Sequence, residues 1–336
     1  IDNQEQHDRG QHFTNTNEVD LVSAFTINEN SNFIFDSGCG AGTFLVRAYY
    51  FLKHFHPGLH HKALLEKVWG VEIAPFPVFL STMNLCLLDI RSFENYPVII
   101  NQDFSEVRGN SYYHMYFLNG NKTFKVKNIN KKEADVQIPR FDACIGNPPY
   151  IRQELIENKE DWNHLAQVEW NLDKINQQSD LYVYYLMHTA AFLKDKGRLG
   201  YVVSGSWLDV AYGKDLQKFL LDHFKIIAII DNQKTRSFPT ASVNTVIIIL
   251  EKCKNKNERD ANDVRFIRLF KDYEAFIGSG SDTGRIDRVI KFAGQLENTK
   301  QTIHQDDYSI TVVHQWKLEK DSTFNCRYKN GHWGAK

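Results

Sequence analysis

Short apolar segments and segments with helical periodicity alternate along most of this chain. In the helical segments apolar residues recur three and four positions apart, as at Phe44, Leu45 and Ala48. Near-continuous apolar strands that alternate with helices predict a parallel sheet covered on both faces. The predicted strands are residues 32–36, 67–73, 97–101, 141–146, 198–204, 226–231 and 243–251, and the predicted helices are residues 42–55, 76–89, 181–193 and 214–224.

The last two predicted strands, 226–231 and 243–251, are joined by a loop without a good helical pattern. A connection of this kind predicts an antiparallel hairpin. The fold class that follows is α/β: a doubly wound, Rossmann-like sheet of seven strands with an antiparallel hairpin at one edge.

Two segments interrupt the alternation, and a third follows it. Residues 107–140 are polar, aromatic and rich in lysine, which predicts an inserted hairpin. Residues 153–180 are acidic and rich in amides, which predicts a lid or binding loop. The chain becomes strongly charged beyond Glu251, which predicts a domain boundary there. We therefore expect one domain over residues 1–255 and a connector over residues 256–336.

Composition narrows the class of protein. The 336 residues are 42% hydrophobic and 24% charged, with a net charge of −1, which is typical of soluble globular proteins and excludes an overall basic nucleic-acid binder. Five scattered cysteines form no CxxC pair, and no apolar segment reaches transmembrane length. We therefore expect reduced thiols, a cytoplasmic location and no membrane partner. Because the first residue is not methionine, we expect a piece of a longer protein.

A glycine-rich loop, DSGCGAGTF at residues 36–44, follows the first predicted strand. Gly38, Gly40 and Gly42 allow positive φ and close approach by a ligand. The GxGxG spacing, led by Asp36, differs from the GxGxxG of dinucleotide sites and favours a ligand that carries an ammonium group. A tight strand-to-helix turn without a ligand is the alternative.

Acidic residues also end the next two predicted strands. A carboxylate at Glu72 can accept hydrogen bonds from two ribose hydroxyls. Asp103 can accept from an exocyclic amine, and Phe104 can cover the face of an adenine. Because the carboxyl ends of parallel strands share one edge of a sheet, these residues together with Asp36 predict a site for an adenosine with a charged tail.

The fourth predicted strand ends in Asn147-Pro148-Pro149-Tyr150. The Asn147 side-chain oxygen and the Pro148 carbonyl can accept from the N–H bonds of an exocyclic amine while a methyl group arrives, and the prolines fix the backbone. Tyr150 can stack on a flat base, which must leave the duplex to be reached. Phe238 can cover the second face of that base; a core phenylalanine and an Asn-Pro turn are the alternatives.

With GQHFTN at residues 10–15, these motifs resemble the gamma-class DNA N6-adenine methyltransferases that use S-adenosylmethionine. Asn15 stands where that family usually has proline. The ending NGHWGAK at residues 330–336 resembles the approach to the recognition domain in type IIG restriction–modification enzymes. The resemblance implies contacts with the cofactor from Thr14, Asp36, Gly38, Cys39, Gly40, Gly42, Glu72, Ile73, Asp103, Phe104, Asn147 and Pro149. It implies catalysis by Asn147, Pro148, Pro149 and Tyr150, and stacking by Tyr150 and Phe238.

The function implied is methyl transfer to N6 of a flipped-out adenine in double-stranded DNA, within a prokaryotic restriction–modification system. S-adenosylhomocysteine would be the product. A nuclease domain or subunit would be a partner, and a target-recognition domain would follow the connector. The NPPY motif is shared by methyltransferases that act on a protein glutamine or an RNA base, so these remain alternatives, as does a non-catalytic DNA-binding subunit.

Two other clusters do not predict sites. The histidines at 54, 56, 60 and 61 lack the spacing of a metal site, so no metal is expected. The lysines at 122, 125, 127, 131 and 132 are suited to contact phosphates, and a solvated hairpin explains them equally well.

Overall fold

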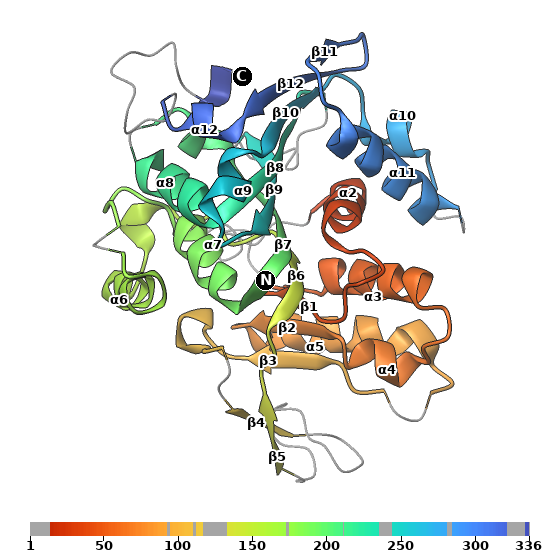
Figure 1. Ribbon diagram of the computed structural model, residues 1–336. Helices are drawn as coiled ribbons and strands as arrows, with labels where there is room; N and C mark the ends of the chain where they lie inside the picture. Colours follow the sequence, from red (N-terminus) through yellow and green to blue (C-terminus); the bar gives the residue numbers. More distant parts are fainter. Residues whose placement is uncertain are drawn as a thin grey trace.

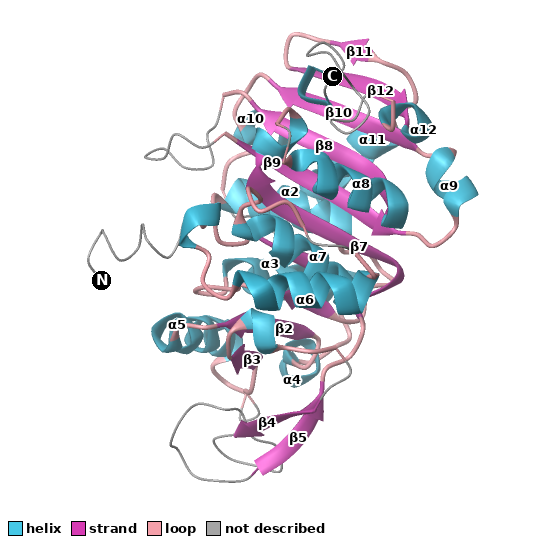
Figure 2. Ribbon diagram, turned by 90° about the vertical axis from the view of Figure 1, so that its left-hand side faces the viewer, coloured by secondary structure: helices cyan, strands magenta, loops and turns pink. Residues whose placement is uncertain are grey.

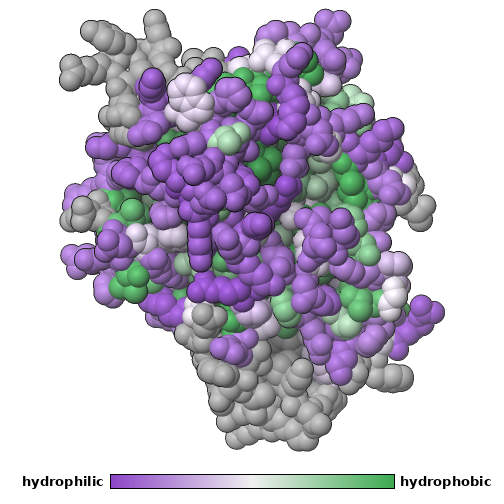
Figure 3. Space-filling view, in the orientation of Figure 1, coloured by the Kyte–Doolittle hydropathy of each residue, from purple (hydrophilic) through white to green (hydrophobic). Residues whose placement is uncertain are grey.

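A computed structural model describes residues 14–92, 95–109, 112–116, 133–172, 175–210, 212–234, 244–280, 284–320 and 333–335. One large twisted sheet runs through the molecule, with helices on both faces (Figures 1 and 2). The predicted doubly wound α/β class is confirmed. Hydrophilic side chains cover most of the face in Figure 3, as the charged composition leads one to expect.

The large sheet has ten strands in the order β11-β12-β10-β8-β9-β7-β6-β1-β2-β3. Its first half winds outward from β1 through β2 to β3, and the chain then returns to place β6 on the other side of β1. The strand order therefore reverses between β1 and β6, which is where α/β sheets bind ligands. The bounds are β1 Ile34–Asp36, β2 Val68–Glu72, β3 Val98–Asn101, β6 Phe141–Gly146, β7 Leu193–Ser204, β8 Phe224–Asn232, β9 Thr245–Lys252, β10 Asp263–Leu269, β11 Ile303–His304 and β12 Tyr308–His314.

Two hydrophobic cores lie on opposite faces of the sheet. One is built with residues of α6, α7 and α8, and the other with residues of α2, α3, α5 and α11 (Figure 1). The helices are α2 Thr16–Thr26, α3 Thr43–Phe55, α4 His61–Leu65, α5 Pro75–Cys86, α6 Lys159–Trp170, α7 Leu181–Phe192, α8 Gly213–His223, α9 Lys256–Asp260, α10 Tyr273–Ile277, α11 Arg285–Asn298 and α12 Gln315–Leu318. Short 3-10 helices are η1 Leu87–Asp89, η2 Phe104–Glu106, η3 Gln153–Leu155, η4 Gly205–Leu208 and η6 Trp333–Ala335.

The sheet is wider than the seven strands predicted. Strands β8 and β9 form the predicted antiparallel pair, but β10 pairs with β8 in parallel, so the hairpin does not end the sheet. Antiparallel strands β12 and β11 end it instead. The sequence did not predict β10, because Arg265 interrupts its apolar pattern. In the structure the guanidinium of Arg265 is buried and donates to the carbonyls of Asp263 and Thr299. The division at residue 255 stays a prediction, although the sheet itself continues across it.

The two predicted insertions have different structures. Strands β4 (Tyr112–Tyr116) and β5 (Glu133–Gln137) pair antiparallel as a separate two-stranded sheet, which confirms the inserted hairpin. The segment after residue 153 contains η3 and α6. None of the helices in the described part of the chain is long and apolar enough to cross a membrane.

Candidate active site

A cavity of about 770 Å³ opens at the carboxyl ends of β1, β2, β3 and β6, beside the point where the strand order reverses. Cavities of this size hold small organic ligands. The structure therefore brings together residues that lie more than a hundred positions apart in the sequence. The expected site residues that line the cavity are Thr14, Asp36, Gly38, Cys39, Gly40, Glu72, Ile73, Asp103, Phe104, Asn147 and Pro149.

Asp36 ends β1 and is 2% exposed. Its Oδ1 accepts a hydrogen bond of 3.1 Å from the Gly38 backbone N–H. Burial and the neighbouring Glu72 carboxylate raise the pKa of Asp36 to about 7, although the Gly38 bond opposes them. The neighbouring strand approaches closely here, since a Cβ on Gly146 would lie 2.8 Å from that oxygen. A cationic group in the cavity would favour the ionised form of Asp36.

Glu72 holds the glycine loop in place. The Gly40 N–H donates to Glu72 Oε2 at 3.0 Å, and the Ala74 N–H donates to Oε1 at 2.9 Å. Gly40 and Gly42 have positive φ, of 51° and 85°. Gly42 precedes α3 and is absent from the cavity wall, and a Cβ there would lie 2.9 Å from Ser81 Cβ. Its role in the structure is thus the close packing of α3 against α5.

The end of β3 leads to Asp103 and Phe104. Asp103 caps η2, with Oδ1 accepting from the Ser105 N–H at 2.8 Å. Phe104 is 1% exposed and belongs to an aromatic cluster, with ring centroids 5.2 Å from Tyr185 and 4.4 Å from His188. The ring therefore meets the cavity from within a packed wall, which fixes its position.

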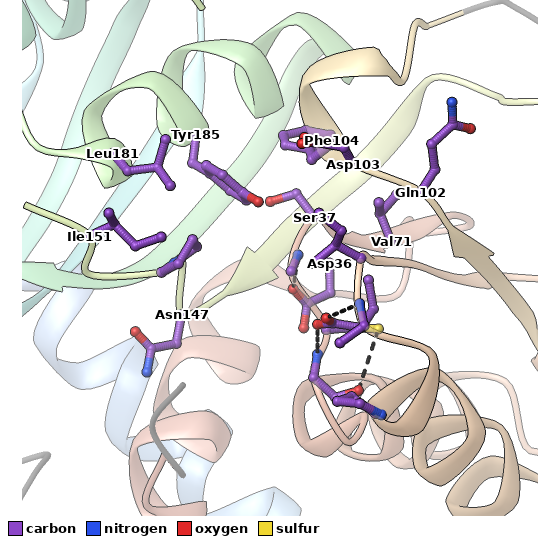
Figure 4. Close-up of a pocket in the computed structure, with 18 of the residues that line it drawn as sticks. Asp36, Ser37, Val71, Gln102, Asp103, Phe104, Asn147, Ile151, Leu181 and Tyr185 are labelled. Carbon is purple, nitrogen blue, oxygen red and sulfur yellow. Dashed lines mark hydrogen bonds between the residues drawn. The ribbon is translucent and has the colours of Figure 1, made fainter. Parts of the chain in front are cut away.

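Asn147 follows β6 and lies across the cavity from Asp36 and Asp103 (Figure 4). Its Nδ2 donates to Thr14 Oγ1 at 2.9 Å. Its Oδ1 is buried and has no hydrogen-bond partner within the described residues. Thr14 therefore orients the amide, and among the described residues nothing donates to its oxygen. An acceptor left this way is costly unless a ligand satisfies it.

The other residues of this motif take separate positions. Pro148 is buried and absent from the cavity wall. The Tyr150 hydroxyl donates to the Val202 carbonyl at 2.8 Å, and burial raises the pKa of that hydroxyl well above its usual range. Tyr150 too is absent from the cavity wall, and its ring centroid lies 6.4 Å from that of Tyr182. Phe238 lies outside the residues that the structure describes.

Several wall residues were not expected from the sequence. Figure 4 shows Tyr185 of α7 facing Ser37 and Asp103, with Ile151 and Leu181 on the side of Asn147. Burial, with the nearby carboxylates, raises the pKa of the Tyr185 hydroxyl far above its usual range, so the hydroxyl stays protonated as a donor. Because α7 is apolar on nearly every side, its sequence carried no signal for which face meets the cavity.

The polar side chains of the cavity wall indicate the kind of ligand that fits. Over the described residues, no group of three or more histidine, cysteine or acidic side chains is placed to hold a metal ion. The carboxylates of Asp36, Glu72 and Asp103 instead line one side of the cavity, where they suit a ligand with a cation and several hydroxyl or amine donors.

Comparison with known proteins gives a consistent result. The family model described as "Eco57I restriction-modification methylase" matches residues 66–238, just over half of the chain. A curated relative, type II methyltransferase M.BstVI of Geobacillus stearothermophilus, is 33% identical over 211 residues, which cover 60% of this chain and 37% of the relative. Type II methyltransferase M.AccI of Acinetobacter calcoaceticus is 29% identical over 197 residues, with coverages of 57% and 32%. The matched part is thus a minor share of each relative's length.

Solved structures share the fold at low identity. The type IIG restriction endonuclease BpuSI superposes with a TM-score of 0.67 at 14% identity, covering 95% of this chain and 33% of that one. A type I restriction-modification methyltransferase subunit from Streptococcus thermophilus gives a TM-score of 0.59 at 17% identity, with coverages of 97% and 60%.

Proposed function

The chain belongs to the Eco57I restriction-modification methylase family, and from that membership we propose that it methylates N6 of adenine in DNA. S-adenosylmethionine supplies an activated methyl group: N6 bonds to the methyl carbon, the carbon–sulfur bond breaks with its electrons going to sulfur, and N6 gives up a proton. The products are N6-methyladenine and S-adenosylhomocysteine. The observation that carries the proposal is the amide of Asn147, which Thr14 orients and whose oxygen has no hydrogen-bond partner among the described residues.

The carboxylate side of the cavity fits the methyl donor. Asp36, whose pKa is raised to about 7 by burial and by the Glu72 carboxylate, suits the ammonium of the methionine part. Glu72 is held at a strand tip by two backbone N–H groups and is the proposed acceptor for the ribose hydroxyls. Asp103 and the fixed ring of Phe104 suit the adenine. With Gly38, Cys39, Gly40, Ile73 and Pro149 these residues form the proposed donor site.

Asn147 is the proposed catalytic acceptor. The lone pair of an exocyclic amine is delocalised into the base, so the amine is a poor nucleophile. An acceptor aimed at its N–H bonds stabilises the tetrahedral, positively charged nitrogen that develops as the methyl group arrives. No described residue competes for Asn147 Oδ1, and the Pro148 carbonyl is the proposed second acceptor.

The base is proposed to enter from the duplex by flipping, because its amine is inaccessible within the stack. Tyr150 and Phe238 are the proposed stacking residues. The hydrogen bond from the Tyr150 hydroxyl to Val202 anchors the ring without using its faces. Base–aromatic stacking contributes about 1–3 kcal/mol per base.

The wider organisation is also a proposal, because the chain spans only about a third of the curated relatives it matches. We propose a methyltransferase domain over residues 1–255 and a connector over 256–336 toward a target-recognition domain. A nuclease domain or subunit and double-stranded DNA are the proposed partners, in the cytoplasm of a prokaryotic cell.

Methylation of mixed genomic DNA with tritium-labelled S-adenosylmethionine tests the function. Nucleoside mass spectrometry should find N6-methyldeoxyadenosine, and Asn147→Ala should lower its formation about 100-fold or more. The donor's calorimetric Kd should change little in that variant. Asn257→Ala, at an exposed position on α9, is the matched control.

Three outcomes would contradict the proposal. Label in cytosine would overturn the target atom, and label in RNA or a protein glutamine would overturn the substrate. Donor binding without transfer to any of these would favour the non-catalytic subunit.

A further inference from the structure

A second cavity, of about 450 Å³, lies at the opposite ends of the strands. Its wall includes Arg140, immediately before β6, and Lys252, the last residue of β9. These positions mark the amino ends of the parallel strands, whereas the candidate active site lies at their carboxyl ends. The two cavities share no lining residue, so the second one lies outside the candidate active site.

Positive charge dominates the wall of this cavity. Its cations are Arg108, Arg140, Lys252 and Lys254. Its one carboxylate belongs to Glu169, whose two oxygens lie 2.8 and 2.9 Å from His188 Nδ1. Within the described residues, no ion pair joins Arg140, Lys252 or Lys254 to a carboxylate. Arg140, Lys252 and Lys254 therefore lack the direct ion pairs that basic side chains so close together usually have.

The negative C-terminal ends of three helices offset part of this positive charge. Helices α6, α7 and α8 all end near the cavity, and each helix end carries a partial charge of roughly −0.5. Lys252 Nζ donates to the carbonyls of Ala190 and Leu193 at 2.8 and 3.1 Å, so it caps α7. Within the part of the chain that the structure describes, neither Arg140 nor Lys254 donates to a carbonyl at a helix end.

The surroundings of Lys252 show the effect of this positive charge. Its ammonium lies 4.9 Å from the centroid of the Trp170 ring. Burial, then repulsion by Arg140 and to a lesser extent by Lys254, lowers the pKa of Lys252 to about 8. A lysine that caps a helix and faces an aromatic ring would otherwise have its charge favoured. An anion between the three cations would remove the repulsion.

We propose that this cavity binds a phosphate-type oxyanion through Arg140, Lys252 and Lys254. A planar guanidinium and two ammonium groups present donors to several oxygens at once, which suits a tetrahedral, multiply charged ligand better than a carboxylate. The cavity volume is in the range of small-ligand sites. The phosphate belongs either to a small phosphorylated molecule or to the phosphodiester backbone of DNA.

Calorimetric titration with inorganic pyrophosphate tests the site. The double variant Arg140→Gln and Lys254→Gln changes two exposed side chains and leaves the Lys252 cap of α7 intact. It should weaken pyrophosphate binding about tenfold or more. The control, Lys291→Gln with Lys300→Gln, removes the same charge from exposed positions elsewhere and should bind as the wild type does. Equal binding by all three proteins, or by none, would overturn the proposal.

A second measurement separates the two sources of phosphate. If the cavity holds the DNA backbone, the double variant should reduce the dependence of log K on log salt by about two for a duplex of mixed sequence. An unchanged slope, together with weakened pyrophosphate binding, assigns the site to a small phosphorylated molecule. Neither result depends on methyl transfer.

Discussion

Replacement of Thr14 by valine keeps Asn147 in place but removes the hydrogen bond that orients its amide. Thr14 Oγ1 accepts a 2.9 Å hydrogen bond from Asn147 Nδ2, which fixes the rotation of the amide and so the position of Oδ1. Valine has the same shape but no acceptor, so Nδ2 loses its partner. The lost bond contributes about 1–2 kcal/mol to the orientation. Because the proposed reaction needs one orientation of this amide, kcat should fall about 5- to 30-fold.

Single-turnover transfer from saturating labelled S-adenosylmethionine is the assay, with KM for the donor measured separately. Thr14→Ser retains the hydroxyl and should restore kcat to within about twofold. Thr16→Val, at an exposed position two residues on, controls for the loss of a threonine hydroxyl. The reasoning fails if kcat of Thr14→Val equals that of the wild type. It fails equally if only the donor KM rises, because Thr14 would then contact the donor without orienting Asn147.

Three further predictions follow from the strand tips. Asp36 is protonated below a pH of about 7 in the protein without ligand, so affinity for S-adenosylmethionine should rise about tenfold per pH unit up to that pH and then level off. Calorimetry from pH 5.5 to 8 measures this profile. Asp36→Asn should flatten it. Gly146→Ala places a Cβ 2.8 Å from the Asp36 carboxylate and should raise the donor Kd about tenfold, with Gly294→Ala, which meets open space, as the control. Gly42→Ala combines a φ of 85° with a 2.9 Å approach to Ser81 Cβ, so it should lower the free energy of unfolding by about 1–3 kcal/mol in urea titration.

The sequence was informative where local pattern and tertiary role agree. The apolar strands before Asp36, Glu72 and Asn147 end at polar residues because the sheet buries the strands and exposes their tips to the cavity. Topology then places these tips along one edge, without any long-range information beyond the parallel arrangement. The meeting of these polar residues at one cavity was therefore predictable in outline.

Helix α2 shows why the rest was not. It carries Glu18 and Asp20, which a pattern treats as solvent-facing, yet both are buried. Asp20 pairs with Arg47 and with Arg285, which is 265 residues away. The same applies to Tyr185, whose position in the cavity depends on how α7 crosses the sheet. Partners that meet only in the fold leave no periodic signal in the sequence.

The charge distribution in the cavity explains why an amide stands at position 147. A carboxylate there would offer oxygens of the same reach, but it would follow Gly146, which already lies against the Asp36 carboxylate. Asp36 has a pKa of about 7 with Glu72 nearby, and Asp103 lies in the same wall, so a fourth carboxylate would favour a proton on one of the four groups. A proton on residue 147 would turn one of its two oxygens into a donor, and a proton on Asp36 would remove the negative charge proposed to meet the methyl donor's ammonium. Asparagine supplies the acceptor oxygen without charge, and Thr14 supplies the orientation that a symmetric carboxylate would not need.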